Sequence, residues 1–342
     1  MVDKVKPWLW IPPHWAHHLG PIFLRTYGRM KPLQALTWAP FTWRDLEFTN
    51  PLGTAGGVDK DASCVDGWWS LGAGFLEVGT ITPLPQRGHP GKVMDRNRKA
   101  EAVWNRLGFP SVGLEAVARR LKELYQPHFT PIFANIGKNK STSLDEASRD
   151  YIKCIEGLNG FVDAFVLNIS SPNTEGLRQL LKPSSLRFFL EPIVTANIEI
   201  TGLKDAERAT PLLLKISPDI SLDELGKILE ISLSLNINGW ILTNTTMGMR
   251  DNLGFPQEGG VSGRPLAQKA RELLTATLDI LGDRRKGKLI VSTGGVMSPS
   301  DVFERLQMGA DLVQVYSALV FSGPWFFRDV AYRASLTPEI QC

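Results

Sequence analysis

The amino-acid sequence predicts an α/β fold, a (β/α)₈ TIM barrel with a small N-terminal helical extension. From about residue 50 onward, eight short apolar runs alternate with amphipathic stretches, as buried parallel strands alternate with helices. The chain has 342 residues, whereas such a barrel takes about 250, which leaves roughly 90 for an extension and insertions. The alternative is an open doubly wound sheet, but no Gly-x-Gly-x-x-Gly motif opens the first helix.

The N-terminus differs in composition from the rest of the chain, because five of the ten Trp lie within the first 43 residues. These are Trp8, Trp10, Trp15, Trp38 and Trp43. Apolar residues recur at helical spacing from Trp15 to Tyr27, which predicts an amphipathic helix over residues 14–28 that Pro21 kinks or divides. Aromatic and basic groups together are typical of a helix in a membrane interface. A helix packed on the barrel is the equally weighted alternative.

The eight runs read as the barrel strands in chain order. They are Leu52–Ala55, Phe75–Val78, Ile132–Ala134, Ala164–Leu167, Leu212–Leu214, Trp240–Leu242, Leu289–Val291 and Leu312–Val315. Helices are expected over Leu222–Leu235 and Ala267–Leu281, and a third begins where Ser298 caps the helix and Pro299 takes its first position. Thr82 to Gly108 reads as a long loop over one barrel mouth, and residues 184–210 read as a helix followed by a polar surface insertion.

The composition excludes several classes of protein. An apolar fraction of 43% and a charged fraction of 21% indicate a folded globular chain, and a net charge of +3 does not argue for a nucleic-acid partner. Three widely spaced Cys with no Cys-x-x-Cys predict neither a disulfide framework nor a metal site, and favour a reducing compartment. The five His all precede residue 129, so a base from the later part of the chain is not His.

Ligands of such barrels bind at the carboxyl ends of the strands, so the residues that follow each run are candidate site residues. Glycines follow the seventh run, at Gly294 and Gly295, and Tyr316 and Ser317 follow the eighth. These two loops form the usual phosphate site of the fold, although a tight turn explains the glycines equally well. Gly263 beside Arg264 adds to the pattern and favours a phosphorylated cofactor.

Amides and hydroxyls gather at the same strand ends. They are Asn135, Asn168, Asn173, Asn244 and Thr245. Asn is disfavoured in strands, and its mixed donors and acceptors suit a planar ligand such as a pyrimidine, with turn formation as the alternative explanation. Lys60 and Lys215 end strands one and five, where a buried ammonium requires an anion or an electron-rich ring. Ser171 is the candidate base, although a turn hydroxyl before Pro172 is favoured without further observations.

In their order and spacing, these segments resemble the dihydroorotate dehydrogenase family. The matching motifs are Asn50 to Lys60, Gly79 to Pro83, Asn105 to Phe109, Asn135 to Lys140, Asn168 to Arg178, Thr243 to Thr246, Gly259 to Leu266 and Gly309 to Ser317. The Ser-Ser-Pro-Asn-Thr sequence that contains Ser171 is similar to the class 2, quinone-dependent, membrane-associated members of the family, because the soluble class 1 members carry Cys as the base. The resemblance covers about residues 45 to 325.

The resemblance implies oxidation of dihydroorotate to orotate in pyrimidine synthesis, with bound FMN as hydride acceptor and a membrane quinone as final acceptor. Ser171 would be the catalytic base that removes the proton from ring C5, and Lys215 would tune the flavin near its N1 region. The implied substrate residues are Lys60, Asn105, Arg106, Leu107, Gly108, Phe109, Asn168, Asn173, Asn244 and Thr245. The implied FMN residues are Gly56, Gly57, Lys60, Thr80, Asn135, Asn168, Lys215, Thr243, Gly263, Gly295, Tyr316 and Ser317.

Three segments depart from the family pattern. Ala55-Gly56-Gly57 stands where the family usually has Ala-Ala-Gly, Pro110 replaces an Asn, and only Arg96 matches in the segment from Lys92 to Arg96. Pro110 affects the geometry of the loop over the substrate. The segment from Lys92 to Arg96 affects the quinone tunnel, because this segment borders the tunnel in the family.

The resemblance also assigns the N-terminus. Residues 1–40 would form a helical, membrane-associating extension that admits quinone, with His17, Arg96 and Tyr316 lining its tunnel, and residues 41–336 would form the FMN-binding barrel. The expected protein is a monomer that lies peripherally on a lipid bilayer surface, at the cytoplasmic face of a bacterial inner membrane, or at the mitochondrial inner membrane in a eukaryote. The alternatives are a related FMN barrel that uses another pyrimidine or a soluble electron acceptor, and a non-catalytic membrane-bound flavin barrel.

Overall fold

Eight parallel strands close into a barrel in the computed structural model, which describes residues 6–31, 33, 35–124, 128–202 and 209–337. All eight predicted runs become barrel strands, and each pairs with the next in chain order. The barrel strands are β3 (Leu52–Asp59), β4 (Phe75–Ile81), β7 (Ile132–Ile136), β8 (Ala164–Leu167), β9 (Leu212–Ile216), β10 (Gly239–Leu242), β12 (Leu289–Thr293) and β13 (Leu312–Val315). The barrel closes where Val313 of β13 pairs with Leu52 of β3. The predicted fold class is therefore confirmed.

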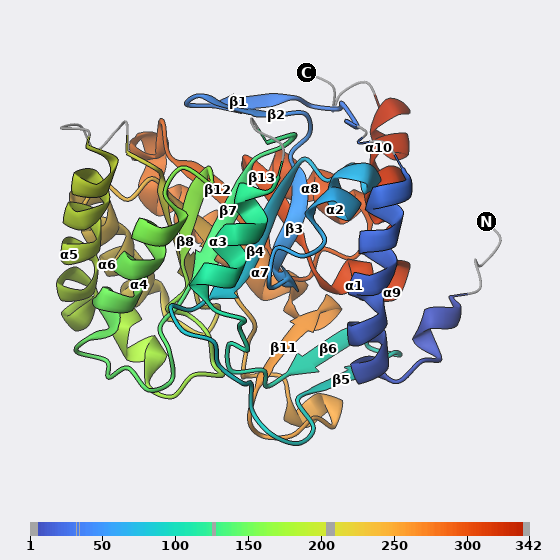
Figure 1. Cartoon of the computed structure of the whole chain (residues 1–342), viewed down its shortest axis with the longest axis horizontal. Coiled ribbons are helices and arrows are strands. Elements are labelled where there is room, and N and C mark those ends of the chain that lie inside the picture. The colour runs from blue at the N-terminus through green and yellow to red at the C-terminus, as the bar shows by residue number, and fades with distance from the viewer. Residues whose placement is uncertain (1–5, 32, 34, 125–127, 203–208, 338–342) are drawn as a thin grey trace.

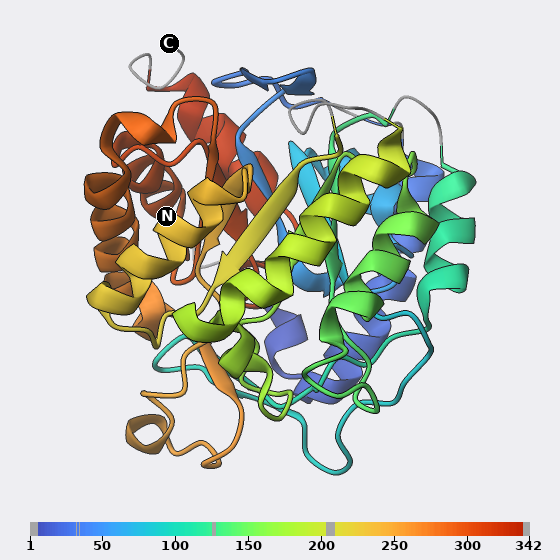
Figure 2. The ribbon, with the colours of Figure 1, turned by 90° about the vertical axis from the view of Figure 1, so that its left-hand side faces the viewer.

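Helices cover the outside of the barrel (Figure 1), and Figure 2 shows those of the middle of the chain crossing it side by side. They are α2 (Val65–Leu71), α3 (Leu114–Lys122), α4 (Ala147–Leu158), α5 (Pro183–Thr201), α6 (Leu222–Ser234), α7 (Ala267–Leu281), α8 (Pro299–Gln307), α9 (Ser317–Ser322) and α10 (Phe326–Ser335). The predicted start of α8 is confirmed, because the Ser298 hydroxyl accepts a hydrogen bond from the N–H of Asp301 in a capping box. The polar insertion expected after α5 lies outside the described residues at 203–208.

A short hairpin closes one end of the barrel, at the top of Figure 1. Its strands are β1 (Phe41–Trp43) and β2 (Leu46–Phe48). Trp43 and Phe48 are buried against inward-facing residues of the barrel strands, such as Phe75 and Phe133. These aromatic side chains fill the barrel interior at this end, so ligands must use the opposite mouth.

The opposite mouth carries a three-stranded antiparallel sheet, which lies below the barrel in Figure 1. It comprises β5 (Met94–Asn97), β6 (Ala102–Asn105) and β11 (Gly260–Gly263). The expectation of a plain loop from Thr82 to Gly108 was therefore wrong, because β5 and β6 form there and β6 pairs with the distant β11. Such a pairing leaves no local pattern. This sheet places Asn105 and Gly263 over the same mouth.

The predicted N-terminal helix is α1 (Pro13–Met30), and its helical geometry continues through Pro21. It runs alongside α2 (Figure 1), where a Cβ added at Gly28 would lie 2.6 Å from the backbone nitrogen of Gly67. Leu24 is buried in the main core, whereas Trp15, Leu19, Ile22 and Phe23 are all exposed. The short helix η1 (Pro7–Leu9) precedes α1, and the Trp8 indole donates to the carbonyl of Val320 at 3.0 Å. None of the described helices is long and apolar enough to cross a membrane.

Candidate active site

A cavity with about 1000 Å³ of empty volume lies at the carboxyl ends of the barrel strands, under the β5–β6–β11 sheet. This end of the barrel is the usual ligand-binding end of the fold. The sequence-predicted residues that line it are Gly56, Gly57, Lys60, Thr80, Asn105, Leu107, Gly108, Phe109, Asn135, Asn168, Ser171, Asn173, Lys215, Thr243, Asn244, Thr245, Gly263, Gly295, Tyr316 and Ser317. Residues from all eight barrel units thus meet in one place.

Arg106 is the predicted substrate residue that does not line this cavity. Its guanidinium forms an ion pair with Glu258 and donates to the carbonyl of Pro90 at 3.3 Å. The alternating direction of side chains along an extended segment explains the outcome, because the side chain of neighbouring Asn105 contacts Asn173 instead. Arg106 therefore ties together the segments that cover the mouth.

The amide side chains form two hydrogen-bonded groups. The Asn168 amide donates to Asn135 Oδ1 and to Thr80 Oγ1, both at 3.1 Å, and Asn244 donates back to Asn168 Oδ1 at 3.2 Å. Asn173 donates to Asn105 Oδ1 at 2.9 Å, and its own Oδ1 is buried without a partner in the described structure. A buried acceptor without a donor is costly, so Asn173 is suited to a ligand N–H.

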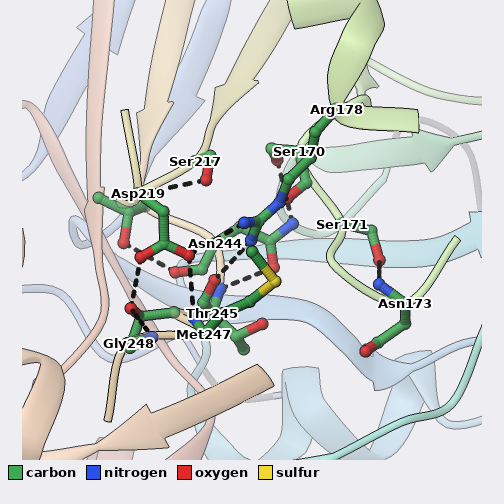
Figure 3. A network of polar contacts seen from close by, with 12 residues as sticks. Ser170, Ser171, Asn173, Arg178, Ser217, Asp219, Asn244, Thr245, Met247 and Gly248 are labelled. Carbon is green, nitrogen blue, oxygen red and sulfur yellow. Dashed lines mark hydrogen bonds and ion pairs between the residues drawn. The ribbon is translucent and has the colours of Figure 1, made fainter. Parts of the chain in front are cut away.

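Ser171 lies in the loop after β8 and is buried in the cavity wall. Its Oγ accepts a hydrogen bond from the backbone N–H of Asn173 at 3.2 Å (Figure 3). This hydrogen bond is the turn role that the sequence favoured for Ser171. Because the Ser171 oxygen is the acceptor in it, the hydroxyl proton remains available to donate to another group. The turn role and a role toward a ligand are therefore compatible.

A buried ion pair lies at the floor of the cavity. Lys215 Nζ is 2.7 Å from Oε1 of Glu77, a side chain of β4 that is fully buried. Asn135 donates to the same oxygen at 2.5 Å, and Gln314 of β13 donates to Oε2 at 2.7 Å. One carboxylate therefore orients two of the predicted cofactor residues.

Glu77 and Gln314 were missed at the sequence level, where both were absorbed into apolar strand runs. The lack of a near acidic neighbour made Lys215 a strong candidate, yet its partner is 138 residues away. A signal did exist, since a carboxylate in the middle of an apolar strand is almost never buried without a partner. Two such polar residues in separate barrel strands indicate an internal network.

The charged side chains in the described cavity wall are two lysines, one of which, Lys215, is neutralised by Glu77. Among its described lining residues, Lys60 and Lys215 are the only charged side chains, and none is a carboxylate. Burial lowers the pKa of Lys60 to about 8, against the opposing effect of nearby Asp61 and Asp59. Burial also raises the pKa of Tyr316 to about 12, which keeps its phenol neutral at physiological pH. The cavity is suited to an anionic ligand.

The loops after β12 and β13 form the corner of the cavity where a phosphate was predicted. Gly294 and Gly295 both have positive φ, at 101° and 74°, which glycine adopts without strain. Ser262 and Ser317 share a hydrogen bond of 2.9 Å at this corner. Backbone N–H groups and hydroxyls together are suitable donors for a phosphate group.

A second cavity, mainly apolar, lies between α1, β5 and the segment from Tyr316 to Trp325. Two of its lining residues, Gly57 and Tyr316, also line the first cavity, so the two cavities meet there. Arg96 lines it, and donates to the carbonyls of Leu9 and Ile11, each at 2.5 Å. The side chain of His17, the third residue predicted for this region, lies outside the described part of the structure.

Within the described residues, no cluster of His, Cys, Asp or Glu could hold a metal ion. Cys64 and Cys154 are buried free thiols, as the sequence led us to expect, and Cys342 lies outside the described residues. Burial raises the pKa of the Cys64 thiol to about 12, so it is not a reactive thiolate.

Comparison with known proteins identifies a family. The family model of dihydroorotate dehydrogenase matches residues 41–334. A curated protein of Thermus thermophilus named "Dihydroorotate dehydrogenase (quinone)" is 43% identical over 287 residues, which cover 83% of this chain and 78% of that protein. The protein of the same name from Acidithiobacillus ferrooxidans is 39% identical over 331 residues, which cover 93% of this chain and 90% of that protein.

Solved structures agree with this result. The crystal structure of DHODH in complex with ferulenol from Eimeria tenella superposes with a TM-score of 0.84 at 28% identity, and covers 96% of this chain and 93% of that chain. The ligand-free form from the same organism gives a TM-score of 0.81 at 32% identity, and covers 94% of this chain and 93% of that chain. The resemblance noted in the sequence is confirmed, and the chain belongs to the dihydroorotate dehydrogenase family, within the quinone-dependent branch that these relatives represent.

Proposed function

We propose that this protein oxidises (S)-dihydroorotate to orotate in de novo pyrimidine biosynthesis, with FMN as hydride acceptor and a membrane quinone as final electron acceptor. The observation that carries the proposal is the pair of cavities that meet at Gly57 and Tyr316. One is polar and lined by two lysines, and the other is mainly apolar and lies beside α1, which carries exposed apolar side chains. Family membership supports the same reaction.

The residues of the first cavity fit FMN. Gly294 and Gly295 supply the positive φ angles at the glycine corner, where backbone N–H groups would donate to a phosphate. Thr80, Asn135 and Lys215 present donors along one wall, and Gln314 Oε1 is a buried acceptor without a partner in the described structure. When bound there, FMN would supply a two-electron acceptor for the hydride that leaves C6 of the substrate.

Ser171 would take the proton from C5 of dihydroorotate, so that loss of the C5 proton and the C6 hydride forms the double bond of orotate. A serine is a weak base unless the site excludes water and its own proton is passed on. Burial of Ser171, Asn135 and Asn168 supports the first condition. Asn105, Asn173, Asn244 and Thr245 would hold the pyrimidine edge, where they exclude water and orient C5 toward Ser171.

Reduction of a quinone rather than a soluble acceptor is favoured by the second cavity. A quinone tail is apolar, as are Leu19, Phe23, Leu319 and Val320 in the cavity wall. Exposed Trp15 and Ile22 on the same helix would sit in the lipid surface and bring the opening to the quinone pool. This arrangement supports a peripheral membrane protein. We place it at the cytoplasmic face of a bacterial inner membrane, or at the inner mitochondrial membrane in a eukaryote. We expect the protein to act as a monomer.

The direct test is to determine which electron acceptor the protein reduces. Purified protein that is supplied with dihydroorotate should reduce a ubiquinone analogue at about 1 to 1000 turnovers per second, and should reduce neither fumarate nor NAD. The measurement is orotate absorbance together with quinone absorbance. Turnover with fumarate or NAD would favour the alternative of a barrel with a soluble acceptor. Absence of turnover with every acceptor, in a flavin-loaded protein, would favour a non-catalytic barrel.

The pH dependence of substrate binding provides a separate prediction. Burial lowers the pKa of Lys60 to about 8, so its ammonium is present below pH 8 and is lost above it. If that charge holds the substrate carboxylate, kcat/KM for dihydroorotate should fall about tenfold per pH unit above that pKa. Replacement Lys60→Arg keeps a charge at all relevant pH values, so the alkaline limb should move out of range. A limb that persists in Lys60→Arg would assign the titration to another group.

A further inference from the structure

Arg178 joins three loops at the barrel mouth without lining the cavity itself. It lies in the short helix η2 (Leu177–Leu181), just after the loop that contains Ser171. Its Nε donates to the carbonyl of Ser170 at 3.1 Å, and its Nη2 donates to the carbonyl of Thr245 at 3.2 Å. Its Nη1 forms an ion pair with Asp219 at 2.9 Å (Figure 3). The three contacts reach the loops after β8, β10 and β9.

Asp219 completes the connection from the other side. One carboxylate oxygen accepts from the Thr246 hydroxyl at 2.5 Å, and the other accepts from the Met247 N–H at 2.9 Å. The backbone N–H of Asp219 is itself held by Ser217 Oγ at 3.2 Å. Burial opposes the charge of Asp219, but these hydrogen bonds and Arg178 outweigh it and lower the pKa of the carboxyl. The carboxylate therefore stays charged at neutral pH.

We propose that Arg178 and Asp219 are positioning residues that set Ser171 against the predicted substrate residues Asn244 and Thr245. The inference rests on the proposed function. Ser170, which Arg178 holds, is adjacent to Ser171, and Thr245, which it also holds, lines the cavity. A single guanidinium therefore links the loop of the base to the loop of the substrate amides.

The physical argument concerns the shape of the guanidinium. Three directional donors in one plane reach two carbonyls and one carboxylate, and an ammonium group has no comparable planar fork. Without Arg178, both carbonyls lose a donor, and Asp219 keeps only its longer ion pair with Lys269 at 3.4 Å. The two loops are then free to shift, and a displacement of about 1 Å at a reacting centre costs on the order of 100-fold in rate. FMN contacts at the glycine corner are unaffected, because neither residue lines the cavity.

The test separates the two half-reactions of the full-length, flavin-loaded enzyme. In Arg178→Met and Arg178→Lys, flavin reduction by dihydroorotate should slow by about 10- to 100-fold in single-turnover measurements. The dissociation constant of orotate, measured by calorimetry, should rise at least about tenfold, because the amides are displaced. Enzyme that has been reduced chemically should be reoxidised by quinone at the wild-type rate, since that route uses the second cavity. Asp219→Asn should show the same split to a smaller degree, because its one amide oxygen can still accept from Arg178 and from the N–H of Met247, although the charge is lost.

Arg284 offers a matched control. Its guanidinium also reaches one carboxylate, that of Glu230 at 2.6 Å, and two backbone carbonyls, those of Ile280 and Leu281. It lies on the exposed outer surface, so Arg284→Met should keep both half-reactions and the orotate affinity of the wild type.

Two results would overturn the proposed positioning role of Arg178 and Asp219. One is wild-type flavin reduction and orotate affinity in both Arg178 variants. The other is an equal fall in both half-reactions with loss of flavin, which would indicate a role in fold stability alone. If dihydroorotate does not reduce the flavin bound to the wild-type enzyme, the proposed function is refuted, and the positioning role of Arg178 and Asp219 is refuted with it.

Discussion

Replacement Ser171→Ala should lower dihydroorotate turnover by about 10²- to 10⁴-fold, the usual contribution of a positioned general base. The protein should remain yellow, because the change removes one oxygen from a side chain that is 5% exposed and leaves the glycine corner and Lys215 in place. The lost oxygen accepts only the N–H of Asn173 within the described structure, so the loop loses one hydrogen bond. Stopped-flow flavin reduction by dihydroorotate measures the effect directly.

A matched serine separates catalysis from packing. Ser232 on α6 is also buried, and its hydroxyl donates to the carbonyl of Ile228 at 2.6 Å, far from the mouth. Ser232→Ala should retain wild-type reduction rates, with only the small stability loss of one buried hydrogen bond, about 1 kcal/mol. Equal reduction rates in wild type and Ser171→Ala would end the assignment of Ser171 as the base.

Replacement Gly20→Phe should block the second cavity and lower the rate of quinone reduction by at least about tenfold, the equivalent of about 1.4 kcal/mol in the barrier. Gly20 lies in the middle of α1 and lines the cavity, and a Cβ added there would meet no atom within 4 Å. The new ring therefore has room to occupy space that an apolar quinone would otherwise use. Flavin reduction by dihydroorotate should be unchanged, because the first cavity lies beyond Gly57 and Tyr316.

Gly226 is the matched position for this experiment. It lies inside α6, and a Cβ added there would also meet no atom within 4 Å. Loss of glycine should favour helix formation by several tenths of a kcal/mol in α6. In α1 that gain is opposed, because Pro21 follows Gly20 and disfavours helical geometry at the residue before it. Retained flavin reduction in Gly20→Phe is therefore the check that the variant is folded. Gly226→Phe should keep full quinone turnover. Unchanged quinone kinetics in Gly20→Phe would argue that quinone reaches the flavin by a route other than this cavity.

Much of the site could be predicted from the sequence because a barrel converts linear position into spatial position. Each barrel strand brings its carboxyl end to the same mouth, so residues such as Asn135, Asn168 and Asn244 meet although they lie far apart in the chain. The eight strands and the N-terminal cap of α8 could be predicted because each depends on a pattern of neighbouring residues. The local sequence could not show which N-terminal tryptophans are buried. Trp38 and Trp43 are core residues, whereas Trp10 and Trp15 are exposed.

The sequence alone determined the barrel, its mouth and the residues that surround it, because strand alternation, helix periodicity and capping are properties of neighbouring residues. Tertiary structure alone decided which distant groups pair, both charged side chains and strands. Glu77 reaches Lys215 across the barrel, Arg178 reaches Asp219, and β6 pairs with β11 over the mouth. These contacts depend on closure of the barrel, which brings into contact groups that share no local pattern, and burial then makes each pairing obligatory. The same closure makes the two cavities meet at Gly57 and Tyr316.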